Sequence, residues 1–180
     1  TTLSGIELAR VQRMLDELLE DPRIDAKRVG MWGLSLGGQA TMYWTPLEPR
    51  IKVAIVSAWF NRRTEKMAIP SDRYSCFLET KEEHAFLRGW LTEFTDYDVV
   101  SLICPRPLAI QVGKKDPIAH WPYVVEDFKI ARTHYDKLGL DERIELQLHD
   151  GAHETLVEPG VAFLIRWLKD GPVLDAWGSR

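Results

Sequence analysis

Apolar side chains recur every three or four positions in three stretches of the chain, which is the spacing of an amphipathic helix. These stretches are residues 3–20, 121–138 and 156–169. In the first of them, Ser4 and Glu7 have the spacing of a capping box. In the last, the same spacing predicts a buried stripe made of Val157, Val161, Leu164 and Leu168.

Short runs rich in β-branched residues lie between the helical stretches and predict four strands, at residues 29–32, 51–57, 107–113 and 143–149. The run at 51–57 is apolar almost throughout, as expected of a strand that is covered on both faces. The run at 143–149 alternates between apolar and polar residues, which favours a position at or near the edge of a sheet. Strands that alternate with helices predict an α/β fold with a mostly parallel, doubly wound sheet and flanking helices.

Residues 58–101 have no clean hydrophobic period and are rich in aromatic side chains. A segment of this length and composition is more often functional or partly helical than disordered. We expect a helix at about residues 79–90 and interpret the segment as a cap-like insertion, with a packing or dimer surface as the alternative. Residues 1–180 are then one catalytic domain that carries this insertion.

Composition narrows the classes of function. The chain has 180 residues, enough for one domain with a core, and its net charge of -4 without a basic cluster argues against nucleic-acid binding. We find neither an apolar run of membrane-spanning length nor a signal peptide, so no membrane partner is expected. The sequence does not assign a compartment, and the cytoplasm is the expectation in the absence of a targeting signal. Cys76 and Cys104 are interpreted as free thiols, with a single bridge as the alternative.

The most informative short motif is Gly33-Leu-Ser35-Leu-Gly37, which stands between a predicted strand and a predicted helix at residues 35–44. This is the pattern of a nucleophile elbow, in which a serine on a sharp strand-to-helix turn presents its hydroxyl in the open. Glycine before and after the serine prevents clashes with the neighbouring strand and helix. The pattern alone arises by chance in roughly one chain in twenty of this length.

Two further polar residues follow predicted strands, and their positions support the interpretation of the motif as a nucleophile elbow. Asp116 comes after the strand at 107–113, and His153 comes after the strand at 143–149. Catalytic groups of parallel α/β sheets lie on loops at the carboxyl ends of the strands. Ser35, Asp116 and His153 therefore have the places and the chain order of a hydrolase triad.

The segments around these residues resemble the C-terminal half of an α/β-hydrolase. They are GLSLGG at the elbow, the stretch from Pro105 to Asp116, and Gly151-Ala-His-Glu154. The details are most similar to the dienelactone-hydrolase and acetyl-xylan-esterase-like group. Dienelactone hydrolases proper use cysteine as the nucleophile, so a serine at position 35 favours an esterase.

The resemblance implies a role for each residue. Ser35 is the nucleophile, His153 the general base, and Asp116 the acid that orients the imidazole. The backbone N–H of Leu36 is one donor of the oxyanion hole, and the second donor is expected from a loop upstream of the elbow. Because a single helix precedes the elbow, we expect either that an N-terminal half is missing from this sequence or that a partner chain, such as a second copy, completes the sheet.

The predicted function is hydrolysis of a small-molecule carboxylic ester through an acyl-enzyme, with no cofactor and no metal. A serine peptidase or a thioesterase of the same fold remains open, as does an inactive fragment or binding module completed by another chain. Trp59 is a candidate substrate-binding residue or a core residue, with equal support for each. Asp150 and Glu154 are rivals of Asp116 as the acid. The pair Arg62-Arg63 is interpreted as solvated, with contact to an anionic substrate as the alternative.

Overall fold

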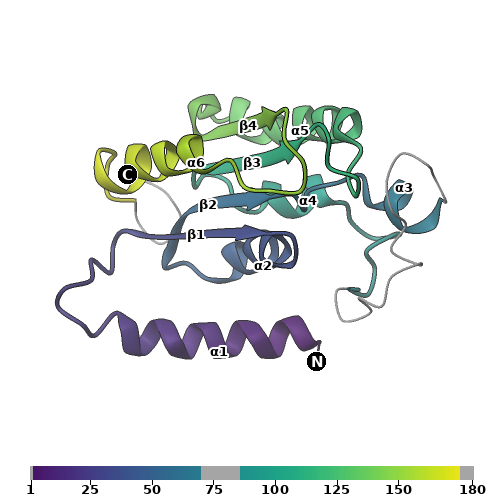
Figure 1. Ribbon diagram of the computed structural model, residues 1–180. Helices are drawn as coiled ribbons and strands as arrows, with labels where there is room; N and C mark the ends of the chain where they lie inside the picture. The colour runs from purple at the N-terminus through teal and green to yellow at the C-terminus, as the bar shows by residue number, and fades with distance from the viewer. Residues whose placement is uncertain (1, 70–85, 175–180) are drawn as a thin grey trace.

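The computed structural model describes residues 2–69 and 86–174, which form a parallel sheet between two layers of helices (Figure 1). The strands lie in the order β1-β2-β3-β4, and every neighbouring pair is parallel. All four arrows point the same way, so the loops that follow the strands gather at one edge (Figure 1). The strands are β1 Val29–Leu34, β2 Ile51–Ser57, β3 Leu108–Gly113 and β4 Ile144–His149.

The four predicted strands and the parallel α/β architecture are confirmed. Strand β2 is buried at all seven positions, in agreement with its continuous apolar run, and β4 lies at one edge, in agreement with its alternation. Strand β1 lies at the other edge and is only partly buried. The helices are α1 Leu3–Leu18, α2 Leu36–Trp44, α3 Arg63–Ala68, α4 Asp96–Ser101, α5 Trp121–Asp136 and α6 Val157–Leu164, with short helical turns at η1 Thr45–Leu47, η4 Asp141–Arg143 and η5 Ile165–Lys169.

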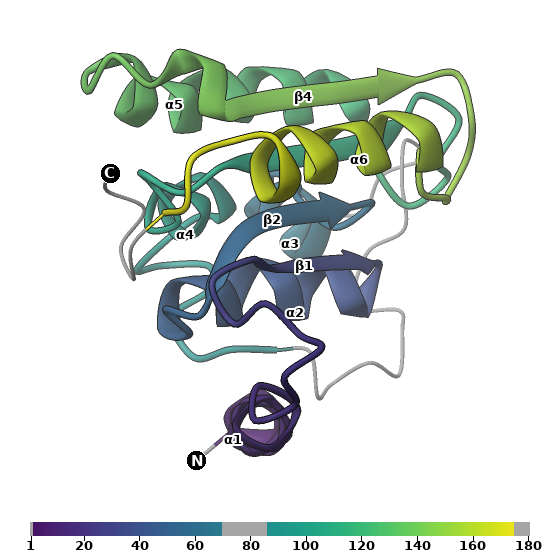
Figure 2. The ribbon, with the colours of Figure 1, turned by 90° about the vertical axis from the view of Figure 1, so that its left-hand side faces the viewer.

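The two faces of the sheet have separate cores. On one face, α2, α4 and α5 pack against β2 and β3 through residues such as Met42, Val100 and Phe128. On the other face, α6 and η5 pack through Phe163 and Trp167. Figure 2 shows α6 in front of the sheet and α2 behind β1. Helix α1 belongs to neither layer, because it lies beyond β1, outside the sheet, in both views (Figures 1 and 2).

A row of polar side chains crosses all four strands near their carboxyl ends. Trp32 Nε1 donates to Ser57 Oγ at 2.8 Å, Ser57 Oγ donates to Gln111 Oε1 at 2.5 Å, and Gln111 Nε2 donates to Gln147 Oε1 at 2.6 Å. Buried polar groups are stable only when they are paired, so this row fixes the strands relative to one another. The strand ends that carry the predicted site are therefore rigid.

Several local predictions were wrong, and the contacts explain why. Thr2, not Ser4, caps α1 by accepting the Gly5 N–H at 3.1 Å, because the Ser4 hydroxyl accepts a hydrogen bond from Trp44 Nε1 instead. Helix α6 buries Phe163, and η5 buries Trp167. Of the predicted stripe, Leu164 and Leu168 pack against these residues, as expected, whereas Val157 and Val161 are exposed. Apolar residues lie on more than one face of residues 157–168, so the periodicity alone could not choose the buried one.

The predicted insertion contains more local structure than its sequence indicated. Two short helices, α3 and α4, fall within residues 58–101. Residues 86–90 are a loop and turn rather than the end of a helix, and the rest of the helix expected at 79–90 lies outside the described residues, as does Cys76. Cys104 is a free thiol, and burial raises its pKa.

Candidate active site

Ser35 occupies the turn between β1 and α2 with φ 58° and ψ -120°. This backbone region strongly favours glycine, and a non-glycine residue in it costs on the order of 1–3 kcal/mol. The turn is held by the Ser35 N–H, which donates to the Ser57 carbonyl at 3.0 Å, and by the Gln39 N–H, which donates to the Ser35 carbonyl at 3.0 Å. The Ser35 side chain makes no capping hydrogen bond to α2.

The elbow depends on glycine at two positions, and one of them differs from the prediction. A Cβ on Gly33 would lie 2.0 Å from the Gly37 carbonyl oxygen, so the prediction for Gly33 is confirmed. A Cβ on Gly37 would meet nothing within 4 Å, so the steric argument for this position was wrong. The second close approach is at Gly38, where a Cβ would lie 2.7 Å from the Ser57 carbonyl oxygen and 2.9 Å from Trp59 Cβ.

This difference gives a matched pair of alanine variants. Gly33→Ala is expected to lower the free energy of unfolding by about 2–3 kcal/mol, because the added methyl group collides with backbone that cannot move away. Gly37→Ala is expected to change it by less than about 1 kcal/mol, and in the stabilising direction, because alanine favours the helix. Urea denaturation followed by circular dichroism measures both values, and equal losses for the two variants would contradict this account of the elbow.

Asp116 and His153 are in direct contact. Asp116 Oδ2 lies 2.8 Å from His153 Nδ1, and Asp116 Oδ1 accepts the Ile118 N–H at 2.9 Å. The Asp116 side chain is fully buried, whereas 28% of the His153 side chain is exposed. With Nδ1 turned to the acid, Nε2 is the ring nitrogen that remains for proton transfer.

Backbone contacts hold the loop after β3, which carries Asp116 (the acid loop), against the loop after β4, which carries His153 (the base loop). The Lys114 N–H donates to the His149 carbonyl at 2.8 Å, and the Lys115 N–H donates to the Gly151 carbonyl at 3.0 Å. A Cβ on Gly113 would lie 2.1 Å from the Ala152 carbonyl oxygen, so glycine permits this close approach. The acid and the base are therefore positioned by paired loops at the ends of β3 and β4.

The structure brings two of the three predicted residues into contact. Ser35 lies at the same edge of the sheet, at the end of β1, and no hydrogen bond joins it to His153 within residues 2–69 and 86–174. Catalytic hydrogen bonds are often long before a substrate is bound. Asp116 contacts His153, whereas the two rival acids have other partners. Asp150 is exposed and pairs with Lys114, and Glu154 accepts the Ala152 N–H.

The remaining candidates have clear positions. Leu36 is the first residue of α2, where N–H groups have no partner within the helix, and its role as an oxyanion donor stays a prediction. Trp59 follows β2, is 4% exposed and stacks on Trp90 with 6.1 Å between ring centroids. Its burial favours the core alternative, and a role for Trp59 in binding substrate stays a prediction.

Sequence reasoning misjudged Arg63 and did not consider its partner. The Arg63 side chain is 1% exposed rather than solvated, and its Nη2 lies 2.6 Å from Asp96 Oδ2. The guanidinium lies over the rings of Trp59 and Trp90, at 4.8 Å and 4.5 Å from their centroids. Arg62 is paired as well, with Asp127 at 2.6 Å. Asp96 at the start of a helix gave no signal of this, because acidic residues are common there.

A metal site was not expected, and the described part of the chain holds no cluster of three or more histidine, cysteine or acidic residues that could bind one. Among the helices of residues 2–69 and 86–174, none combines the length and the hydropathy that a membrane span requires.

Comparison with solved structures places this arrangement in a known fold. A carbohydrate esterase family 15 (CE15) glucuronoyl esterase from Caldicellulosiruptor kristjansonii superposes with a TM-score of 0.73 at 21% identity, over 100% of this chain and 54% of that one. The glucuronoyl esterase catalytic domain from Hypocrea jecorina superposes with a TM-score of 0.71 at 15% identity, over 96% and 53% of the two chains. This chain has the fold of half an α/β-hydrolase. No family model and no curated protein matches its sequence.

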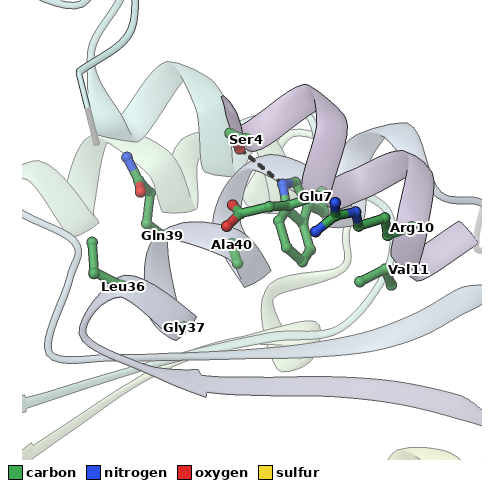
Figure 3. Close-up of a pocket in the computed structure, with 9 residues that line it drawn as sticks. Ser4, Glu7, Arg10, Val11, Leu36, Gly37, Gln39 and Ala40 are labelled. Atoms are coloured by element: carbon green, nitrogen blue, oxygen red, sulfur yellow. Dashed lines mark hydrogen bonds between the residues drawn. The ribbon is translucent and has the colours of Figure 1, made fainter. Parts of the chain in front are cut away.

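The edge of the sheet formed by β1 is open in the part of the chain that the structure describes. Within residues 2–69 and 86–174, β1 pairs with β2 alone, and the apolar side chains of Ile6, Met14 and Leu18 on α1 are exposed. A cavity of about 400 Å³ lies between α1 and α2 (Figure 3). Glu7 and Arg10 of α1 extend toward it opposite Leu36 and Ala40, and none of the predicted triad residues lines it. Leu36, the predicted oxyanion residue, and Gly37 of the elbow are among the residues that line it.

Proposed function

We propose that this chain carries the nucleophile, base and acid of a serine hydrolase that cleaves carboxylic esters. The observation that carries the proposal is the contact between the buried carboxylate of Asp116 and His153, at the same sheet edge as a serine in a strained elbow. A strained, non-glycine residue at a turn is retained only where the surrounding structure holds it, and such residues concentrate at active sites. The fold shared with esterases supports the same reaction class.

In this proposal Ser35 Oγ attacks the acyl carbon while His153 Nε2 takes the hydroxyl proton. The negative charge on the former carbonyl oxygen is stabilised by the Leu36 N–H and by the positive end of α2. His153 then returns the proton to the leaving alcohol, and Ser35 keeps the acyl group as an ester. A water molecule that loses its proton to His153 hydrolyses this ester and restores the Ser35 hydroxyl.

The substrate to test first is an ester of a uronic acid, because proteins named glucuronoyl esterases share the fold. The chain spans about half the length of those proteins, so the walls of the pocket that select acyl group and alcohol include parts that it does not supply. We also propose that residues 1–180 are the C-terminal part of a hydrolase domain. The open side at β1 is where further strands and the second oxyanion donor would join.

The open side also favours a second candidate function, a binding module that another chain completes. An unpaired strand flanked by exposed apolar side chains is a ready site for addition of a strand. This candidate differs from the hydrolase in one measurable respect, which is that it does not require a reactive Ser35.

Labelling with a fluorophosphonate tests the proposal. The folded chain is expected to gain one organophosphoryl group at Ser35, located by peptide mass spectrometry, and Ser35→Ala is expected to gain none. A heat-unfolded sample controls for nonspecific reaction. A folded, monodisperse chain with no label on Ser35 would favour the binding module, whereas turnover of aminoacyl amides in place of esters would favour a peptidase.

A further inference from the structure

Helix α3 carries two buried cationic side chains that point to different parts of the molecule. Arg63 and Lys66 are 2% and 4% exposed. Arg63 binds Asp96 at the start of α4. Lys66 reaches the acid loop, where its Nζ donates a hydrogen bond to the Ile118 carbonyl oxygen.

The residue that Lys66 holds is also the residue that holds the acid. The Ile118 N–H donates to Asp116 Oδ1 at 2.9 Å, and Asp116 Oδ2 lies 2.8 Å from His153 Nδ1. A continuous series of contacts thus runs from the Lys66 ammonium through Ile118 and Asp116 to the imidazole of His153. Each contact in the series fixes the orientation of the next group.

The part of the acid loop that follows Asp116 needs a contact with another element to hold it in place. Before Asp116, the loop is tied to the base loop by the N–H groups of Lys114 and Lys115. After Asp116, the Ile118 and Ala119 N–H groups bond back to Asp116 itself, so they shape the loop without anchoring it to another element. Lys66 supplies an anchor from α3 through the Ile118 carbonyl.

The chemical type of Lys66 also argues for a specific role. Burial of an ammonium group is unfavourable unless hydrogen bonds compensate for lost hydration, whereas a methionine of similar length would fill the same space without that cost. A charged donor makes a stronger hydrogen bond to a carbonyl than a neutral one does. A lysine at this position therefore exchanges some stability for a firm hold on the Ile118 carbonyl.

We propose that Lys66 is a positioning residue, which keeps Asp116 and His153 aligned by anchoring Ile118. This inference rests on the proposed function, since it assigns a purpose to the Asp116–His153 pair. In this role Lys66 acts through the Ile118 carbonyl and the acid loop.

Proton NMR of the 180-residue chain tests the proposal without the need for turnover. The readout is the low-field proton on His153 Nδ1 and its rate of exchange with water, with His153→Gln used to assign the signal. Lys66→Met removes the donor and keeps the length of the side chain, Lys66→Arg keeps a donor, and Lys114→Met is the matched control. Lys114 is a partly exposed lysine of the same loop that pairs with Asp150.

We expect the proton in Lys66→Met to exchange at least about tenfold faster than in the unmodified chain, or to broaden beyond detection, because the hydrogen bond opens more often. Lys66→Arg and Lys114→Met should stay within about threefold of the unmodified chain. In any form of the protein that turns over esters, Lys66→Met should lower kcat about tenfold or more with little change in KM.

Unchanged exchange in a folded Lys66→Met chain would overturn the proposal while leaving the proposed hydrolase intact. If Lys66→Met does not fold, the milder Lys66→Gln is measured, and failure of both to fold would assign Lys66 to stability alone. Absence of the low-field proton from the unmodified chain would instead remove the Asp116–His153 pair, and with it the proposed function. Thermal unfolding of each variant separates a general loss of stability from a loss of alignment.

Discussion

Asp96→Ala is expected to lower the free energy of unfolding by about 3–5 kcal/mol, because it leaves the buried Arg63 guanidinium without its carboxylate. Asp96 is a junction: it accepts hydrogen bonds from Arg63 Nη2 at 2.6 Å, the Asn61 N–H at 2.9 Å and Trp90 Nε1 at 3.3 Å. Its side chain is fully buried, so water cannot replace it. The loss is measured by urea denaturation.

The matched control for this variant is Asp136→Ala. Asp136 forms an exposed ion pair with Arg132 at 3.3 Å, four residues earlier on the same helix, and its loss should cost about 0.5 kcal/mol or less. The double variant Arg63→Met with Asp96→Leu should recover the part of the loss that comes from the unpaired charge, whereas the Asn61 N–H and Trp90 Nε1 still lose their acceptor. An Asp96→Ala chain as stable as Asp136→Ala would show that the buried pair is not a structural junction.

Asp116→Asn is expected to lower ester turnover by about 10⁴-fold with the fold retained. An asparagine fits the same space and can still accept the Ile118 N–H. Its amide group can donate to His153 Nδ1, which selects the tautomer with the proton on Nε2, and that tautomer cannot accept the proton of Ser35. The measurement is kcat/KM for p-nitrophenyl acetate and for an alkyl uronate, or the rate of fluorophosphonate labelling of Ser35 where turnover is too slow.

Asp150→Asn is the control, because Asp150 is the rival acid from the sequence and its side chain is 82% exposed. Its activity should stay within about twofold of the unmodified chain. A large loss for Asp150→Asn together with a small one for Asp116→Asn would move the acid assignment to Asp150.

The sheet and its site loops could be predicted because each depends on local sequence. Strand β2 and the elbow at Ser35 are continuous patterns, and the chain order of Ser35, Asp116 and His153 follows once the strands are placed. Pairing in a parallel sheet then brings the loops together whatever lies between them. The contact between Asp116 and His153 is the part of the site that this reasoning reached and the geometry bears out.

The anchors of the site could not be predicted, because they depend on contacts between residues far apart in sequence. Arg63 and Asp96 are separated by 33 residues, and Lys66 and Ile118 by 52. Nothing in the residues around a lysine indicates which distant carbonyl it will meet. The same holds for Gly37 and Gly38: two adjacent glycines give one sequence pattern, and only the distance to the Ser57 carbonyl distinguishes them.

The strained backbone at Ser35 has a consequence for how this chain has evolved. Glycine would adopt φ 58° and ψ -120° without the steric cost that a serine bears there, so every generation that kept a serine kept a less stable protein than it could have had. Selection for stability alone favours the exchange, and a single nucleotide change converts two of the six serine codons to glycine codons. A lineage that used this domain only to hold another protein would have no reason to resist that drift. If the proposed function holds, the serine at position 35 trades stability for chemistry.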